Sequence, residues 1–535
     1  MTISPTLATR LTLALLLAYA IARGYYFLLP AYTGDEAWFL PAAGVYDQLW
    51  NTLGWRALCE IDNFLAYGAL HWILSGAVGS WGFESGVGAG EAVRVYSLLC
   101  QLAVPAALVV WGWRDGKPHQ TLLALALYVC IPLAWWDGKL ISAETLSMAL
   151  AAAGAALALR DPSRIRALSW LLLGMALGVK LSVLPLAAYV GLCLLPALGW
   201  GVVTLLRLGK IASAAAVGFV FANPFMVCDP LRFVQNLQSN ATRSPDYDAW
   251  TRFKQILYVD PPFNWDFVWN GGILQAGLGP ISLLLMGLFL WREPAARRWA
   301  LPAIGAALLG WALMMGLFRY YHWYLIPILL IPPLLVMQTE KLTQVGSWLL
   351  IGVIGANVIT NHGPIVYLFQ DKLENVANLR QSDAIARCVA QNLRGLDGPL
   401  RVYDNSDYGL NLSRDKIIQW GKTDDLMDGQ QPTRPIYWTQ VEELLAQQGQ
   451  SAPITAHYFS QVRHLGPDLA ARLPDDDGST RHFLLLVGDR AERNLHYLEK
   501  IQQRKRLIVA GRAAPQSAQF RCGYVQGFVY RWDDR

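Results

Sequence analysis

Two adjacent carboxylates, Asp35 and Glu36, follow directly after the first long apolar run of the chain, residues 11–29. Tyr32 and Trp38 flank them, and aromatic side chains are enriched at membrane–water interfaces. An ionisable group at the bilayer centre costs about 2.5–3.5 kcal/mol on insertion scales, and such groups are often functional. A carboxylate here can act as a general base. Alternatively, the two acids only end a helix in water, and these residues alone leave both interpretations open.

The composition indicates an integral membrane protein. Of the 535 residues, 54% are hydrophobic and 16% are charged, whereas soluble chains carry about 25% charged residues. The 22 Trp and 22 Tyr are suited to aromatic belts at two membrane interfaces. The net charge of +5 comes from dispersed Lys and Arg, so we expect no nucleic-acid partner. The seven Cys form no CxxC pair and no Cys/His cluster at zinc-ligand spacing.

Apolar segments predict the elements that position the two acids. A helix needs about 20 apolar residues, with a range of roughly 17–25, to cross a bilayer. Eleven segments reach or approach this length, so we expect a polytopic α-helical protein with about eleven transmembrane helices. They are residues 8–29, 94–113, 120–136, 144–159, 167–180, 182–206, 211–227, 271–291, 299–318, 322–338 and 345–361.

Lys and Arg predict the orientation of these spans, because short cytoplasmic loops carry an excess of both. With the N-terminus inside, the compact basic connections fall on one side, which we assign to the cytoplasm of a bacterial inner membrane. The outer, periplasmic side then receives the long connection 30–93 and everything after about residue 362. The basic connections hold Arg114 and Lys117; Arg160, Arg164 and Arg166; Arg207 and Lys210; Arg292, Arg297 and Arg298; and Lys341.

Within the first outer connection, residues 63–78 are apolar enough to pass for another span. A span there would place every later basic loop outside. We therefore expect an amphipathic or re-entrant helix at the outer face, with His71 and Trp72 near the headgroups. A true span, with a miscount elsewhere, is the alternative.

After about residue 371 the apolar runs shorten, and Asp, Gln and Arg increase. We expect a transmembrane domain over residues 1–361 and a C-terminal α/β periplasmic domain over 362–535. Cys388 and Cys522 can pair on this oxidising side, and the sequence leaves open whether they do. The expected strands are 400–403, 483–487, 507–510 and 528–532, and the expected helices are 376–393, 440–447 and 491–503.

The charged and polar groups outside the basic loops all fall at the outer ends of the predicted spans. A pump or channel needs ionisable groups or broken helices near the midplane. An enzyme that acts on a lipid headgroup needs them at one interface, where a carboxylate can deprotonate a hydroxyl and cations can stabilise a departing phosphate. The groups are Asp35, Glu36, Arg94, Asp137, Lys139, Glu144, Lys180, Asn223, Asp229, Arg319, Tyr320, Tyr321 and His322.

Six short elements in this order resemble the protein O-mannosyltransferase superfamily, which has the GT-C glycosyltransferase fold and includes the lipid A aminoarabinose transferases. Together they cover roughly residues 8–338. The elements are Gly34-Asp35-Glu36-Ala37, Glu91-Ala92-Val93-Arg94, Ser142-Ala143-Glu144-Thr145, the run 174–180, Asn223-Pro224-Phe225, and Arg319-Tyr320 followed by Ile326-Pro327.

The resemblance implies an inverting transferase that uses a polyprenyl-phosphate-linked sugar as donor, with its site facing the periplasm. By the family pattern Asp35 is the general base and Glu36 its neighbour in the site. The residues that would contact the donor phosphate are Lys180, Arg319, Tyr320 and His322. Glu144 is a candidate second carboxylate, Asp62 and Arg94 are further loop and helix-end candidates, and Asp35 with Glu144 would hold a divalent cation if the enzyme uses one.

Two departures from the family pattern limit what the resemblance implies for this chain. Glu144 stands where the family has Asp. The Lys-Pro-Pro element of the aminoarabinose transferases is absent, and residues 61–68 occupy its region, so lipid A as acceptor does not carry over. The sequence therefore leaves the acceptor undecided between a periplasmic glycan, a lipid and a protein.

Alternatives apply to the residues and to the function. Lys180 can be a snorkelling lysine, Glu144 a helix N-terminal charge, Asp62 an exposed loop acid, and Arg319 and His322 ordinary helix-end charges. The rival functions are a transporter or flippase of lipid-linked sugars, and a GT-C enzyme that uses a polyprenyl-diphosphate donor.

Overall fold

The computed structural model describes most of the helical part of the chain and the core of a sheet near its end. The described residues are 4–29, 50–57, 68–87, 89–131, 135, 143–161, 166–198, 202–231, 233–235, 280–316, 326–396, 400–405, 441, 444–449, 454–458, 482–487, 516–523 and 525–531. The chain forms two compact units, the first of residues 1–28 and 46–369 and the second of 29–45 and 370–535, so that one boundary falls inside a helix, between Phe369 and Gln370.

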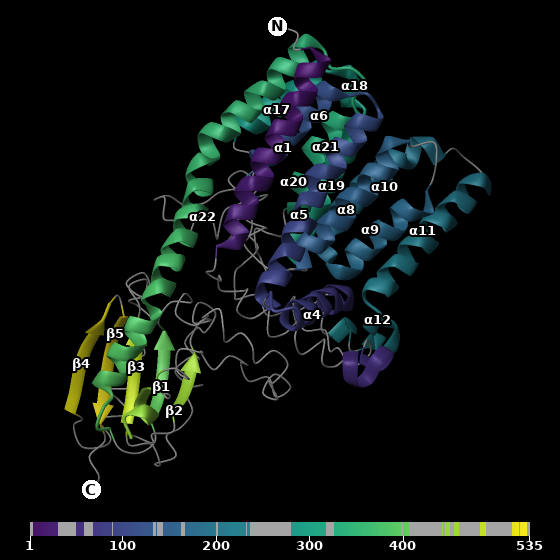
Figure 1. Ribbon diagram of the computed structural model, residues 1–535. Coiled ribbons are helices and arrows are strands. Elements are labelled where there is room, and N and C mark those ends of the chain that lie inside the picture. Colours follow the sequence, from purple (N-terminus) through teal and green to yellow (C-terminus); the bar gives the residue numbers. More distant parts are fainter. Residues whose placement is uncertain are drawn as a thin grey trace. The chain divides into compact units, whose positions relative to one another are not determined.

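The first unit is a bundle of apolar helices (Figure 1). Its longer helices are α1 (Pro5–Leu28), α4 (Ala69–Glu84), α5 (Ala89–Arg114), α6 (Pro118–Val129), α8 (Ala143–Arg160), α9 (Ala167–Val179), α10 (Leu184–Leu198), α11 (Val202–Ala222), α17 (Pro280–Arg292), α19 (Ala300–Gly316), α21 (Ile331–Gln338) and the first part of α22 (Gln344–Asn392). Short helices connect them: η1 (Gly54–Arg56), η4 (Leu181–Val183), α12 (Phe225–Cys228), α18 (Pro294–Arg297) and α20 (Ile326–Leu329).

Length and composition make this unit a multi-pass membrane bundle. Within the described residues, four helices are long and apolar enough to cross a membrane: Pro5–Phe27, Gly90–Arg114, Ala143–Arg160 and Val202–Ala222. Five shorter apolar helices accompany them. Large apolar side chains stay exposed along α1 and α11, as expected of helix faces that meet lipid. The expected total of eleven spans stays a prediction, because several of them fall partly outside the described residues.

The boundary between α10 and α11 differs from the expected one. The sequence suggested spans at 182–206 and 211–227 with Arg207 and Lys210 in a loop, but α10 ends at Leu198 and α11 already begins at Val202. Both basic residues therefore lie in the first turns of α11. The Arg207 guanidinium donates to the Leu198 carbonyl oxygen at 3.0 Å, so it satisfies a carbonyl at the end of α10 from within the next helix.

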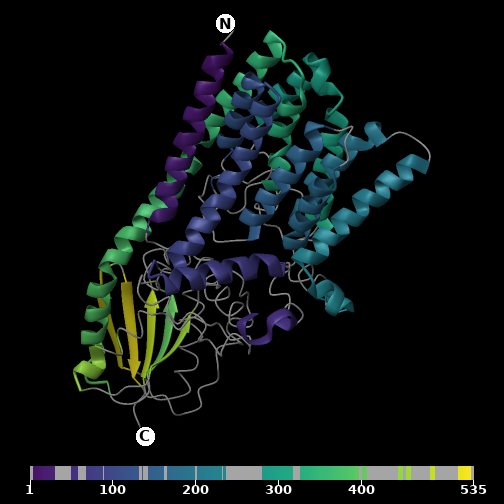
Figure 2. The ribbon, with the colours of Figure 1, turned by 45° about the vertical axis from the view of Figure 1, so that its right-hand side comes forward.

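α4 is the helix expected within the first outer connection, displaced toward the C-terminus from 63–78. It has 16 residues, fewer than the approximately 20 that a spanning helix needs. In Figures 1 and 2 it lies crosswise to the long helices, at the end of the bundle where α5 begins. Its buried side chains, among them His71, Trp72 and Ser75, recur at helical spacing and face the bundle.

Helices α9 and α11 lie side by side with their backbones unusually close (Figure 1). A Cβ on Gly174 would lie 2.0 Å from the Ala215 carbonyl oxygen, and one on Gly218 would lie 2.1 Å from the Leu171 carbonyl oxygen. Small residues let membrane helices approach in this way. The close approach fixes the end of α9, and with it Lys180, beside the end of α11.

The second unit contains a five-stranded mixed sheet in the order β2-β1-β3-β5-β4. Its strands are β1 (Leu400–Asn405), β2 (Ile454–Tyr458), β3 (His482–Val487), β4 (Gln516–Cys522) and β5 (Val525–Arg531). β1 pairs in parallel with β2 and β3, whereas β5 pairs antiparallel with β3 and β4. Three of the expected strands are present, β2 and β4 were missed, and the expected elements 491–503 and 507–510 lie outside the described residues.

The end of α22 packs into the core of this second unit. Ile385, Val389 and Leu393 are buried together with Leu445 and Cys522. Cys388 and Cys522 form a disulfide, which resolves the pairing that the sequence left open. The predicted span 345–361 and the predicted helix 376–393 are parts of one continuous helix of 49 residues.

Gly174→Ala should destabilise the bundle by roughly 1–3 kcal/mol, because the added methyl group cannot fit against the α11 backbone. Unfolding of the purified protein in detergent measures the effect. Gly209→Ala, also on α11, is the matched control, because a Cβ there meets no atom within 4 Å. The control should be neutral or stabilising, since alanine is favoured over glycine in helices by about 1 kcal/mol. Equal losses in the two variants would contradict the close approach.

Candidate functional site

The structure describes three of the predicted site residues: Arg94, Glu144 and Lys180. The remaining six lie outside the described residues, and their roles stay predictions. These are Asp35, Glu36, Asp62, Arg319, Tyr320 and His322.

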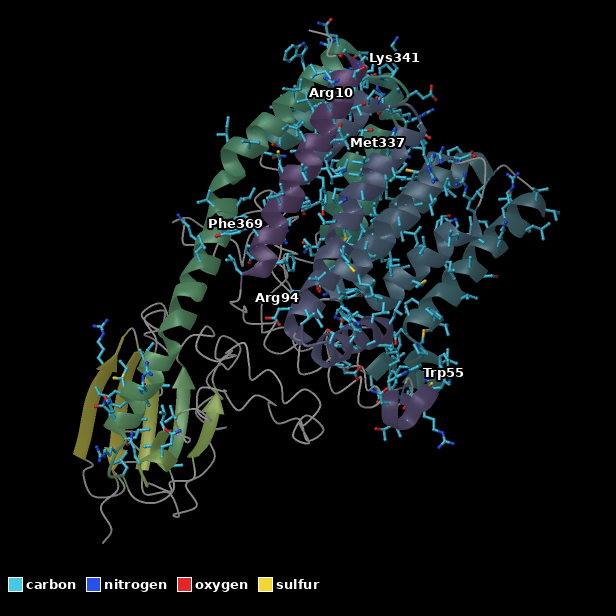
Figure 3. All side chains as sticks on the ribbon, in the orientation of Figure 1. Arg10, Trp55, Arg94, Met337, Lys341 and Phe369 are labelled. Carbon is cyan, nitrogen blue, oxygen red and sulfur yellow. A yellow bond between two sulfur atoms is a disulfide. The ribbon has the colours of Figure 1, made fainter. Side chains whose placement is uncertain are left out.

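The three described residues lie at one end of the helical unit, opposite the basic connections. Figure 3 shows Arg10 and Lys341 at one end, and Arg94 and Trp55 at the other. At the Arg94 end, α5 and α8 begin and α9 and α11 end, and a small apolar cluster joins them to α4. This agrees with the one-sided placement of charges expected from the sequence. The cluster contains Cys100, Ala143, Leu146, Val179 and Ala222, with Leu70, Leu74 and Tyr96 packed against it.

Glu144 and Lys180 form an ion pair inside this end of the bundle. Each residue is only 5% exposed. Glu144 lies in the first turn of α8, where the helix dipole favours a carboxylate. Burial of two charges is costly unless they are paired, so each of these residues depends on the other.

The backbone around Lys180 is fixed on both sides. Its N–H donates to the Ala176 carbonyl oxygen at 2.9 Å as α9 ends, and its own carbonyl accepts from the Val183 N–H at 3.3 Å as η4 begins. Lys180 itself is extended, with φ −156° and ψ 123°. This break between α9 and η4 turns the ammonium toward α8 instead of letting it continue along the helix.

The start of α4 contacts the ends of α9 and α11 beside Lys180. The Gly68 N–H donates to the Val179 carbonyl oxygen at 3.0 Å. A Cβ on Gly68 would lie 2.3 Å from the Gly178 carbonyl oxygen and 2.7 Å from that of Ala222. Glycine at position 68 therefore lets α4 begin directly against the ends of α9 and α11.

His71, on the first turn of α4, belongs to this group of titratable residues. It is fully buried, and its imidazole interacts electrostatically with the charge of Lys180. Burial, together with that charge, lowers the pKa of His71 to about 3. The imidazole is therefore neutral at neutral pH and can offer one N–H and one acceptor nitrogen to a neighbouring group.

Two further predicted elements lie at this end. Arg94, in the first turns of α5, is buried. Asn223 is also buried and directly follows α11, where its N–H donates to the Phe219 carbonyl oxygen at 2.8 Å. Residues far apart in sequence are thus gathered at one end of the bundle.

The described residues do not fit a metal centre. No group of three or more His, Cys, Asp or Glu side chains with metal-ligand geometry occurs among them. The carboxylate of Glu144, which the sequence suggested as a cation ligand, is paired with the Lys180 ammonium. We therefore derive no step through a metal ion.

Sequence reasoning missed two buried polar residues of this unit. His71 was expected only near lipid headgroups, and its polar character within an apolar segment was the available signal. Arg23 was not singled out at all, although it is a lone charge within the apolar run 11–29. It is 1% exposed, and a cation within a span costs about 2.5–3.5 kcal/mol on insertion scales and marks a functional candidate.

The fold and the buried charges define a class: a multi-pass membrane protein whose ionisable groups converge at one end of its helices. Comparison with solved structures identifies the fold. The chain superposes on ArnT, a lipid A aminoarabinose transferase from Cupriavidus metallidurans, in the crystal structure bound to undecaprenyl phosphate, with a TM-score of 0.52, 13% identity and 97% of each chain covered. It therefore has the GT-C glycosyltransferase fold, as the sequence resemblance implied.

Two other solved structures are similar at lower scores. The apo state of the same ArnT gives a TM-score of 0.49 over 97% of each chain, with 13% identity. The arabinofuranosyltransferase AftD from Mycobacteria gives 0.40 with 13% identity, and the whole of this chain spans 40% of AftD. No family model and no curated protein sequence matches the chain.

Glu144→Gln and Lys180→Met should each destabilise the protein by about 3–5 kcal/mol, because each leaves one buried charge without its partner. The double variant Glu144→Gln/Lys180→Met should lose less than either single variant. Chemical unfolding of the purified protein measures all three.

Removal of the exposed pair Arg298–Glu340 serves as the control. Its side chains are 51% and 79% exposed, and such pairs contribute at most about 1 kcal/mol. Additive losses for Glu144 and Lys180, within about 0.5 kcal/mol, would contradict a coupled buried pair.

Proposed function

We propose that the chain is an inverting glycosyltransferase of the bacterial inner membrane. It moves a hexosyl or pentosyl group from a polyprenyl-phosphate-linked donor to an acceptor hydroxyl on the periplasmic side. The observation that carries the proposal is the buried Glu144–Lys180 pair at one end of a GT-C bundle. The ArnT structure that shares the fold was solved with undecaprenyl phosphate, which supports a lipid phosphate as the ligand of that end.

The proposed reaction is a single displacement at the anomeric carbon. Asp35 takes the proton of the acceptor hydroxyl, with Glu36 beside it, and the acceptor oxygen then bonds to the anomeric carbon from the face opposite the leaving group. The bond between that carbon and the phosphate oxygen breaks, and polyprenyl phosphate leaves with the electron pair. Inversion follows from the single displacement.

Cations are needed where negative charge grows on the departing phosphate. Lys180 and Arg319 are proposed for this role, with Tyr320 and His322 as hydrogen-bonding partners. Glu144 holds the Lys180 ammonium in place through their ion pair. A phosphate can replace the carboxylate as its counter-ion, and the α8 helix dipole still stabilises the carboxylate left behind.

The cysteines support an outward orientation of this end. Cys228, in the short helix directly after α11, is disulfide-bonded, as are Cys388 and Cys522 in the second unit. Cys100, Cys130 and Cys193 are free thiols. Disulfides persist in oxidising compartments such as the periplasm.

Asp35→Asn should abolish transfer while leaving expression intact, because the acceptor proton loses its base. Mass spectrometry of cell-envelope glycans measures this in a deletion strain complemented with the wild type or with the variant. Glu84→Gln, which makes the same chemical change at an exposed carboxylate at the end of α4, should restore the glycan fully. Near-normal glycan from the Asp35→Asn strain would reject the base assignment, and an unchanged glycan profile in the deletion strain would reject the transferase.

Lys180→Ala and Arg319→Ala should each weaken binding of undecaprenyl phosphate by about tenfold or more, since each removes a charge-assisted hydrogen bond worth roughly 1.5–3 kcal/mol. Binding to the purified protein in lipid nanodiscs can be followed by native mass spectrometry. The double variant Glu144→Gln/Lys180→Met should bind as weakly as Lys180→Ala, although it leaves no lone buried charge. Unchanged affinity in both single variants would reject the phosphate site.

A further inference from the structure

Arg23 carries a positive charge into the interior of the first unit. It lies in α1, five residues before the helix ends at Leu28, and is almost fully buried. Its Nε and Nη2 both donate to the Gln101 side-chain oxygen, at 3.1 and 2.7 Å. Its Nη1 donates to the Trp135 carbonyl oxygen at 2.7 Å.

The surroundings of this guanidinium are neutral and aromatic. Its central carbon lies 5.2, 5.1 and 5.6 Å from the ring centres of Tyr26, Phe27 and Trp135. Within the described parts of the chain, dipoles and ring faces thus balance the charge, in contrast to the carboxylate that balances Lys180.

Trp135 is itself fixed by several contacts. Its indole N–H donates to the Val129 carbonyl oxygen at 2.6 Å, and its ring packs edge-on against Tyr19 with 4.9 Å between ring centres. α6 has already ended at Val129. Lipid supplies no hydrogen-bond donor, so a side-chain donor to the Trp135 carbonyl must come from the protein. Arg23 is that donor.

These contacts join three chain segments that lead to the candidate site. α1 ends seven residues before Asp35, and the chain after Trp135 leads to α8, which carries Glu144 in its first turn. Gln101 ties both to α5, the helix of Arg94. An apolar side chain at position 23 would fill the same space, yet it could not hold the Trp135 carbonyl.

We propose that Arg23 is a positioning residue: it clamps the Trp135 carbonyl and Gln101, and so holds the end of α1 and the approach to α8, whose first turn carries Glu144, in place against α5. The proposal rests on the proposed function only for its consequence in sugar transfer. The clamp itself is independent of the chemistry.

The test uses Arg23→Met in the full-length protein. Amide hydrogen exchange in peptides that contain Trp135 should become faster by at least about tenfold, because a tertiary hydrogen bond to that segment is lost. Glycan transfer in the complemented deletion strain should fall by about 100-fold, as expected of a misplaced reacting group. Affinity for undecaprenyl phosphate should stay within about twofold, since all three guanidinium nitrogens of Arg23 already donate to protein groups.

Three further variants keep the test decisive. Arg10→Gln, at the exposed opposite end of α1 (Figure 3), is the control and should leave all three measurements unchanged. Gln101→Leu removes the other partner of the clamp and should reproduce the faster exchange at Trp135, even if Arg23→Met fails to fold. Arg23→Lys keeps the charge and can still reach one acceptor, so it should restore part of the transfer.

Unchanged exchange at Trp135 in both Arg23→Met and Gln101→Leu would overturn the clamp. Faster exchange with full transfer would overturn the positioning role. If phosphate affinity fell as far as transfer did, Arg23 would serve general stability or donor binding, which would also overturn the proposal. Absence of transfer by the wild type would count against the proposed function, and exchange and phosphate affinity would still decide the clamp.

Discussion

The structure depends on one electrostatic constraint: a charge buried in a membrane bundle must be balanced from within the protein. At the end where α8 begins and α9 ends, Glu144 and Lys180 meet this requirement for each other. Their meeting fixes the start of α8 relative to the end of α9. The close approach of α9 and α11 through glycine, and of Gly68 to both, is what lets the surrounding backbone enclose the pair.

The same requirement applies to the backbone at helix ends, and the two ends of the bundle meet it differently. At the end where α22 begins, the Glu293 carboxylate accepts one hydrogen bond from the Thr343 N–H at 2.9 Å and another from the Thr343 hydroxyl at 2.8 Å, and Lys117 donates to the Met337 carbonyl oxygen at 3.0 Å. These side chains satisfy backbone groups at the ends of helices. At the other end, Lys180 and Glu144 are paired side chain to side chain, an arrangement in which an anion can compete with the carboxylate for Lys180.

The sequence predicted the elements well where a long apolar run stops at a charge. Predicted spans 94–113 and 144–159 agree with α5 and α8 because Arg114 and Arg160 end both. The α10–α11 boundary was wrong because Arg207 lies inside a helix and reaches back to Leu198. β2 and β4 were missed because each mixes polar with apolar residues and gains its place only from strand pairing. The Glu144–Lys180 pair joins residues far apart in sequence, and neither spacing nor composition encodes that contact.

Among the buried cations of the bundle, Lys180 and Arg23 are balanced in different ways, and the difference separates their roles. An ammonium is a compact charge, and a carboxylate partner can be exchanged for a phosphate of similar charge. The planar guanidinium of Arg23 is spread over a carbonyl, an amide oxygen and three rings, none of which an anion could replace without breaking the contacts between helices. Lys180 is thus suited to bind and release a ligand, whereas Arg23 is suited to hold chain segments in place. The proposed site needs both, because Lys180 can exchange its partner in a defined geometry only if the segments around it are held in place.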